Sequence, residues 1–317
     1  MGDVLERVHA SGLLPAGGRV IVLLSGGRDS VCLLDVACEL LGGGVVGALH
    51  VNYGLREEAA DDEAHCVALC ERLGVTLTVH RTARPAGARG NLQAWARDVR
   101  YGVGAQLAAQ HGALLAAGHT ASDQAETVLY RLASSPGRRA LLGMEPRRGL
   151  LVRPLLAVTR AQTTAWCEAR GLAWREDSAN TTDRFARGRV RGHLLPALRA
   201  VDARAEENVV RTAALLRDEA EVLEQVVDTA LGGSDFIAVD RLAALPRALA
   251  RLIVRRLAEQ ATGAPGARAA ARLDDVLDLG DGALDVGDGA RASVTGGILR
   301  FERTPARPDP GVPSLDT

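Results

Sequence analysis

The stretch Arg19-Val20-Ile21-Val22-Leu23-Leu24 is followed directly by Ser25-Gly26-Gly27-Arg28-Asp29-Ser30. The first six residues are mostly β-branched and apolar, which predicts a buried strand. Helical spacing of apolar residues then runs to a Gly-Gly-Gly sequence at 42–44, where the helix should stop. Two glycines at the junction let the backbone turn and approach a ligand closely. The free N–H groups that begin the helix favour an anion, so the junction predicts a phosphate-binding loop.

Asp29 within this loop has two interpretations. It could hold a magnesium ion, or it could cap the helix. The loop is neither a Walker A sequence nor Gly-x-Gly-x-x-Gly. The simplest alternative is an ordinary strand–helix turn with no ligand.

The first 125 residues repeat this strand–helix alternation. Strands are predicted at 19–24, 45–51, 75–80 and 113–117, and helices at 29–41, 57–73, 91–111 and 123–133. Such β-α units indicate an α/β fold, a doubly wound, Rossmann-like parallel sheet over roughly residues 15–200. Ligands bind at the carboxyl ends of the strands in these sheets. Residues 25–30, 50–56 and 118–123 should therefore meet at one edge.

The pattern changes near residue 202, which predicts a second part. Helices are expected at 207–231 and 241–260, and short strands with Gly turns at 284–302. We therefore predict a catalytic domain over 1–204 and a smaller, mainly helical region over 205–303. The Pro-rich tail, 304–317, is expected to be disordered.

Composition excludes several classes of protein. The chain has 317 residues, 47% of them apolar, and a formal net charge of −1, so it is neither disordered nor a polycation. All 38 basic residues are arginine, so no lysine can form a Schiff base. Five cysteines without a Cys-x-x-Cys pair argue against disulfides or a metal cluster and predict a cytoplasmic protein. No segment approaches the roughly 18 apolar residues of a membrane helix, so no membrane association is expected.

The six-residue loop resembles the pyrophosphate-binding loop of the PP-loop N-type ATP pyrophosphatases. That resemblance implies an enzyme that cleaves ATP between the α and β phosphates and attaches AMP to a carbonyl oxygen, which a nucleophile then displaces. The loop alone does not choose among the members of this superfamily.

Further strings resemble the tRNA(Ile)-lysidine synthetase family within it, in order over about residues 19–200. They are His50-Val51-Asn52-Tyr53-Gly54-Leu55-Arg56, Ala96-Arg97-Asp98-Val99-Arg100-Tyr101, Gly118-His119, Asp123-Gln124-Ala125-Glu126-Thr127, Arg153-Pro154-Leu155-Leu156, Glu176-Asp177-Ser178-Ala179-Asn180 and Arg187-x-x-x-Arg191. The resemblance implies adenylation of the C2 oxygen of the wobble cytidine in tRNA(Ile) with a CAU anticodon. The ε-amine of free L-lysine would then displace AMP and form lysidine. The cofactors implied are ATP and Mg²⁺, and a homodimer is one assembly that the sequence leaves open.

The resemblance also implies roles for individual residues. Those expected to be catalytic are Asp123, Glu126, His119 and Arg97. Those expected to bind ATP are Ser25, Gly26, Gly27, Arg28, Asp29, Ser30, His50 and Asn52. Those expected to bind tRNA are Arg100, Tyr101, Arg187 and Arg191, and Arg184 could join them. Asp29 and Asp123 are expected to hold the metal. The alternatives are a solvated arginine face for the arginines and helix capping for the carboxylates.

The chain departs from the family pattern in several places, the first being Tyr53, which replaces the second His of the string at 50–56. Ser122 stands where the family usually has the first Asp of an Asp-Asp pair, Gly188 replaces an Asn, and residues 134–137 replace a glycine-rich loop. Two rival functions stay open: a tRNA thiolase of the same superfamily, and a nucleotide- or RNA-binding module without catalysis. Cys66 and Cys70 are four residues apart on one helix, a spacing more typical of core than of a cluster ligand.

Overall fold

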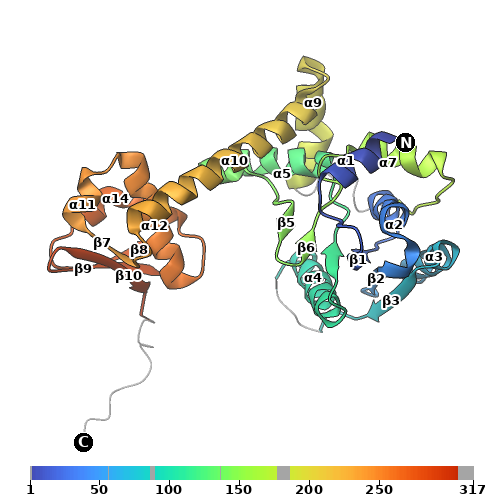
Figure 1. Ribbon diagram of the computed structural model, residues 1–317, viewed down its shortest axis with the longest axis horizontal. Helices are drawn as coiled ribbons and strands as arrows, with labels where there is room; N and C mark the ends of the chain where they lie inside the picture. Colours follow the sequence, from blue (N-terminus) through green and yellow to red (C-terminus); the bar gives the residue numbers. More distant parts are fainter. Residues whose placement is uncertain (1, 56, 86–89, 136, 177–185, 306–317) are drawn as a thin grey trace, which may run out of the picture. The chain divides into compact units, whose positions relative to one another are not determined.

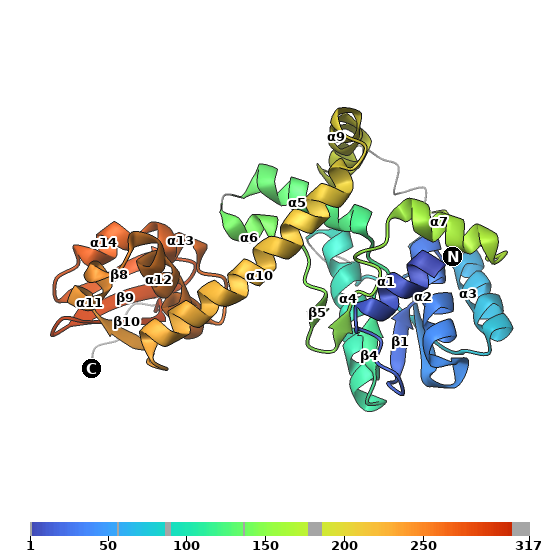
Figure 2. The same ribbon diagram turned by 45° about the horizontal axis from the view of Figure 1, so that its top comes forward.

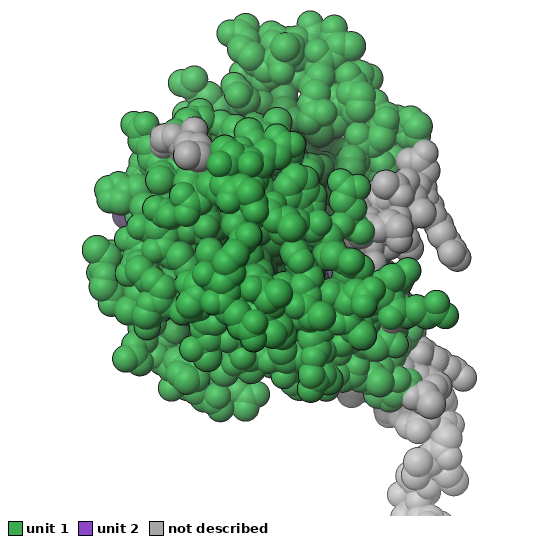
Figure 3. Space-filling view, turned by 90° about the vertical axis from the view of Figure 1, so that its right-hand side faces the viewer, with its two compact units in different colours: residues 1–217 green, residues 218–317 purple. Residues whose placement is uncertain are grey.

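The computed structural model describes residues 2–55, 57–85, 90–135, 137–176 and 186–305. Four parts of the predictions lie outside these residues: Arg56, Asp177–Asn180 of the string that begins at Glu176, Arg184 and the tail from residue 306. The chain forms two compact units, residues 1–217 and 218–317. Figure 3 shows the first unit in space-filling form.

A six-stranded sheet organises the first unit. Its strands are β1 (Val20–Leu23), β2 (Val46–Asn52), β3 (Thr76–Arg81), β4 (Leu114–Ala116), β5 (Arg147–Arg148) and β6 (Leu151–Val152). The order is β3-β2-β1-β4-β6-β5, and every pairing is parallel except that of β5 with β6. The predicted parallel sheet is confirmed, with an added antiparallel edge.

Helices cover both faces of this sheet (Figures 1 and 2). One face packs against α1 (Gly2–Ala10), α2 (Arg28–Leu41), α3 (Ala59–Leu73) and α7 (Arg160–Ala169), and the other against α4 (Leu92–Gln110). The unit also contains α5 (Ala121–Ser134), α6 (Arg138–Leu141), α8 (Ala186–Arg189) and α9 (Leu195–Val201), with a 3₁₀ turn at Gly43–Val45 and a π-helical turn at Val190–Leu194.

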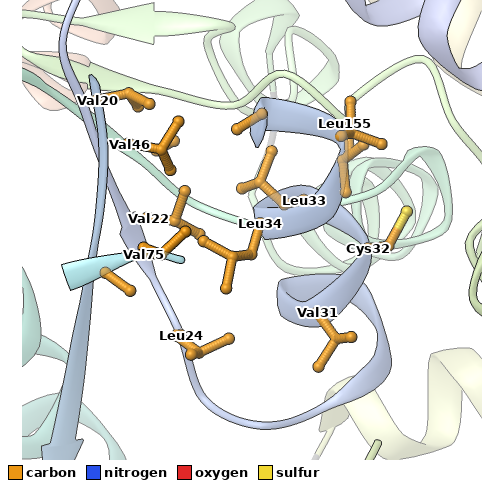
Figure 4. Packing of buried hydrophobic residues seen from close by; sticks show 14 of the residues in the cluster. Val20, Val22, Leu24, Val31, Cys32, Leu33, Leu34, Val46, Val75 and Leu155 are labelled. Carbon is orange, nitrogen blue, oxygen red and sulfur yellow. The ribbon is translucent and has the colours of Figure 1, made fainter. Parts of the chain in front are cut away.

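Alternation along β1 divides the core between the two faces. Val20, Val22 and Leu24 pack with α1, α2, α3 and α7, and Figure 4 shows them against α2. Ile21 and Leu23 point the other way, into the cluster that contains α4. Because both faces of the strand are buried, its sequence is continuously apolar rather than alternating.

The second unit holds the C-terminal half of α10 (Ala205–Leu231) and a core of its own. Its further elements are β7 (Phe236–Ala238), α11 (Val239–Ala244), α12 (Arg247–Thr262), α13 (Ala267–Ala271), α14 (Leu273–Leu277), β8 (Gly282–Gly287), β9 (Ala290–Thr295) and β10 (Ile298–Arg303). The strands form an antiparallel sheet in the order β7-β10-β9-β8. The helices around this sheet match the predicted smaller, mainly helical region.

The prediction of a single helix over 241–260 was wrong in one respect. It is divided into α11 and α12 at Leu245 and Pro246. Proline lacks an N–H and disfavours a helical conformation in the residue before it, so the chain leaves the helix there and starts again.

The predicted domain boundary after residue 204 stays a prediction. Residue 204 directly precedes α10, which runs without interruption through the division between the two compact units at residue 217. In the described part of the chain, no helix combines the length and apolar character needed to cross a bilayer.

Candidate active site

The loop between β1 and α2 is cross-linked by hydrogen bonds of its own serines. Ser30 Oγ donates to Gly27 O at 2.7 Å and accepts from Ser25 N at 3.2 Å, and the two serine hydroxyls lie 3.1 Å apart. Gly26 has φ +82°, a left-handed conformation that glycine adopts without strain. The amides that follow begin α2, so the local structure has the geometry of an anion site.

His50 and Asn52, at the end of β2, form hydrogen bonds that hold the phosphate loop and the loop after β2. His50 is buried, and its Nδ1 lies 2.9 Å from Leu24 O, immediately before the loop. Asn52 donates to Glu63 Oε2 at 2.8 Å and accepts from Gly54 N at 2.9 Å. Both side chains thus contact protein groups, and their predicted contact with ATP stays a prediction.

Gly118 brings the end of β4 against the start of α2. A Cβ at this position would lie 3.0 Å from Asp29 O and 3.1 Å from Ser30 N. Such distances are tighter than most Cβ contacts, and both contacts are with backbone atoms, which would have to shift to admit a side chain. The missing side chain of Gly118 thus lets the end of β4 and the loop after β1 meet. The predicted convergence of residues 25–30 with 118–123 is present.

Asp123 lies in the first turn of α5. Its Oδ2 accepts from the Thr120 backbone N–H at 2.8 Å and from the Thr120 hydroxyl at 2.9 Å, which completes a capping box. Its Oδ1 is 2.9 Å from Arg160 Nη2. Helix capping, the alternative role of Asp123, therefore occupies Oδ2, whereas Oδ1 faces the Arg160 guanidinium.

Arg160, at the start of α7, is the main residue that the sequence analysis missed. Its Nη1 lies 3.3 Å from Glu126 Oε1, and its Nε lies 3.8 Å from Asp29 Oδ2. With the contact to Asp123, one guanidinium faces three carboxylates that come from α2 and α5. The available signal was Thr159-x-x-Gln162, a capping box that places an arginine in the first turn of a helix.

Glu126 is almost fully buried and is also bound by Arg191. Arg191 Nε and Nη2 donate to Oε1 and Oε2 at 2.7 and 2.9 Å, a forked pair that raises the pKa of the arginine. Arg191, expected to bind tRNA, thus lies among the predicted catalytic carboxylates. Arg187 is exposed on α8. The tRNA contacts of both stay predictions.

A basic cluster adjoins these carboxylates. The guanidinium carbons of Arg97 and Arg100 lie 5.1 and 5.2 Å from the ring centre of Tyr101. Arg153 is buried beside them, and its Nη1 donates to Glu145 O at 2.5 Å. Burial lowers the pKa of His119 to about 4, and the nearby arginines act in the same direction. His119 is therefore neutral at pH 7 and cannot donate from both ring nitrogens.

Polar atoms of this cluster are left without protein partners. Among the described residues, the buried atoms with no hydrogen-bond partner include His119 Nδ1, Arg100 Nε, Tyr101 Oη and Arg153 Nε. Buried polar groups are normally hydrogen-bonded. These four atoms are thus suited to contact a polar, anionic substrate.

The cysteines lie in the core. Cys66 and Cys70 are buried on α3, and burial raises their pKa to about 12 and about 11. A thiol with a raised pKa is a poor nucleophile and a poor metal ligand at neutral pH. In the described ranges, no three His, Cys, Asp or Glu residues are grouped so that they could hold a metal ion.

This arrangement agrees with comparisons to known proteins. A family model described as a PP-loop domain matches residues 6–198. A tRNA(Ile)-lysidine synthase from Symbiobacterium thermophilum is 38% identical over 99% of this chain and 71% of its own length. One from Salinispora arenicola is 37% identical over 92% of this chain and 90% of its own length. The chain belongs to the tRNA(Ile)-lysidine synthase family of PP-loop enzymes.

Relatives differ in how far they extend. This chain spans 59% of the length of a Geobacter sulfurreducens member, which is 37% identical over 82% of this chain. Among solved structures, a U34-tRNA thiolase from Methanococcus maripaludis, solved with its [4Fe-4S] cluster, matches 68% of this chain with a TM-score of 0.58. Its sequence identity is 17%, so the match shows a shared fold only.

Proposed function

We propose that this chain adenylates the C2 oxygen of the wobble cytidine, position 34, of tRNA(Ile) with a CAU anticodon, and then joins free L-lysine to C2. The observation that carries the proposal is the convergence of Asp29, Asp123 and Glu126 on one guanidinium beside the phosphate loop. Three carboxylates at such a place can receive the ammonium of an amino acid.

In the first step, the cytidine C2 oxygen attacks the α phosphorus of ATP, and pyrophosphate leaves. The amides and hydroxyls of residues 25–30 bind the phosphates, with Arg28 and Asp29 at the start of α2. His50 and Asn52 hold the neighbouring backbone. Arg97, Arg100 and Tyr101 supply positive charge and a planar ring for the tRNA phosphate and base.

In the second step, the neutral ε-amine of lysine attacks C2, and AMP leaves with the oxygen. Asp123 and Glu126 hold the amino acid, and His119, which is neutral because burial lowers its pKa to about 4, can accept a hydrogen bond from the amine. The proton that the amine loses passes to solvent. Effective catalysis then depends on alignment of the three reactants and on electrostatic stabilisation of the leaving phosphate.

Magnesium fits this site in its donor chemistry. Carboxylate oxygens are the ligands that Mg²⁺ prefers, and Asp29 and Asp123 supply two of them beside the phosphate loop, where both also face Arg160. Because the described residues offer no third ligand of this kind, the remaining ligands would be phosphate oxygens and water. These two residues would hold the ion, which would neutralise charge on the phosphates.

We further propose that residues 205–303 bind tRNA. Several arginines of α12 are neutralised by carboxylates: Arg255 lies 2.9 Å from Glu224 Oε1, and Arg247 pairs with Asp274. Arg211 on α10 and Arg251 on α12 are exposed. These two are the arginines best placed for phosphate contacts. The homodimer that the sequence leaves open stays a prediction.

The test supplies labelled lysine, ATP and tRNA(Ile) to the full chain, followed by mass analysis of the tRNA nucleosides. Lysidine at the wobble position and release of AMP are expected. Incorporation of labelled sulfur would indicate a thiolase, and consumption of ATP without lysine incorporation would indicate another PP-loop reaction. No ATP turnover with tRNA(Ile) would indicate a binding module.

A further inference from the structure

Ser122 and Glu206 form a buried pair beside the three carboxylates. Ser122 is 1% exposed and Glu206 is 7% exposed. The serine hydroxyl donates to Glu206 Oε1 at 2.5 Å and accepts from the backbone N–H of Arg160 at 3.2 Å. Arg199 Nε donates to the other oxygen, Oε2, at 3.0 Å. The buried carboxylate is thus bonded on both oxygens, as burial requires.

The pair joins the starts of three helices. Ser122 lies in the first turn of α5, next to Asp123. Arg160 is the first residue of α7, and Glu206 lies in the first turn of α10. Since the side chain of Arg160 faces Asp29, Asp123 and Glu126, the bond from its backbone to Ser122 helps fix where that side chain lies.

The serine is what allows the glutamate to lie there. Two carboxylates at this separation cannot both be ionised, because each raises the pKa of the other. An aspartate at position 122, the usual residue of the family pattern, would therefore oppose Glu206. This chain has no carboxylate at position 122. A negative charge is supplied there by Glu206, which lies 84 residues further along the sequence.

We propose that Glu206 is a positioning residue for the lysine-binding carboxylates, and that it substitutes from α10 for the acidic residue missing at position 122. This inference rests on the proposed function, because it assigns Asp123 and Glu126 to lysine. Glu206 acts through Ser122 and the Arg160 backbone and touches no substrate.

The first experiment compares Glu206→Gln with Glu207→Gln in the full chain. Glu207 is adjacent on α10 and exposed, so its variant makes the same charge change without the buried pair. Glu206→Gln should lower kcat/KM for lysine about tenfold, since a hydrogen bond to a buried charge is lost. The KM for lysine should rise more than the KM for ATP. Equal behaviour of the two variants, in an active wild type, would overturn the proposal.

The second experiment moves the carboxylate from position 206 to position 122. Ser122→Asp alone should be strongly impaired and should unfold at a lower temperature, because it adds a second carboxylate against Glu206. Adding Glu206→Gln should restore both readouts, since the amide can donate to the new carboxylate. A double variant no better than Ser122→Asp alone would contradict the proposal. A wild type that incorporates no lysine would instead refute the proposed function, which keeps the two failures distinct.

Discussion

Arg160 Nη2 lies 2.9 Å from Asp123 Oδ1, although 37 residues separate them in the chain. Asp123 begins one helix and Arg160 begins another, so the contact ties together two helix starts at the carboxyl edge of the sheet. The Arg160 guanidinium faces three carboxylates, and Arg28 and Arg191 also pair with them, so the three negative charges are balanced by three arginines. Arg160 thereby holds the carboxylates together at the edge where we propose that the substrate ammonium binds.

Arg160→Gln should therefore lower lysine incorporation. Loss of hydrogen bonds to charged groups costs about 1.5–3 kcal/mol, or roughly 10- to 100-fold in rate. Initial rates with labelled lysine check this. Arg19→Gln is the matched control, because Arg19 is exposed and precedes β1 at the opposite edge of the sheet. A rate equal to that of the control would contradict a role for Arg160 in lysine incorporation.

Gly27→Val should reduce ATP affinity while the chain still folds. A Cβ at Gly27 would meet only Ser25 Oγ at 3.4 Å and Arg175 O at 3.8 Å, which are ordinary contacts. The side chain would instead occupy the path by which phosphate approaches the backbone. Calorimetry should show a loss of at least tenfold, about 1.4 kcal/mol. Unchanged affinity would refute the phosphate loop.

Gly118→Ala should act on the same loop by a different route. Its methyl group would press on the backbone of Asp29 and Ser30, so both stability and ATP affinity should fall. Overpacking of this kind costs about 1–3 kcal/mol of unfolding free energy. Urea denaturation measures it, with Gly280→Ala as the control, because nothing lies within 4 Å of a Cβ there and the residue is exposed and outside any helix or strand. Stability equal to that of the control would show that the loop relaxes freely.

Much of this site was predictable because the fold consists of successive β-α units, each formed by neighbouring residues. Each strand end of a parallel sheet lies at the same edge, so the loop at 25–30 and the segment at 118–123 could be placed together from their positions after strands. The contacts of Arg160 and Glu206 could not, because they depend on how helices far apart in sequence are oriented. The interruption between α11 and α12 is different, because Pro246 in the sequence is itself a local signal that a helix ends before it.

Lowering the pH should destabilise the protein through His119. Its folded pKa is about 4, lowered chiefly by burial and by Arg153, Arg100 and Arg97, against the opposing effect of Asp123. The unfolded histidine, with its ordinary pKa near 6.5, takes up a proton between pH 6.5 and 4 while the folded one does not. Stability is therefore lost as pH falls through this window, by up to about 2 kcal/mol at pH 5. His119→Asn should show a smaller loss between pH 7 and pH 5 in urea denaturation, and an equal loss would contradict the assignment.

Arg251→Ala should weaken tRNA binding, whereas Arg247→Ala should change it little. Both residues lie on α12 and are exposed, but Arg247 forms a direct ion pair with Asp274, whereas Arg251 affects that carboxylate only through its charge. An arginine that contacts a phosphate releases a counterion, so its loss should reduce the slope of log affinity against log salt by about 1. Filter binding or anisotropy with tRNA(Ile) over a range of salt concentrations measures that slope. ATP affinity should be the same in both variants, since neither residue belongs to the unit that holds the phosphate loop. If both variants keep the wild-type slope, the phosphate contacts of this region must come from other residues, and the assignment of α12 to tRNA binding fails.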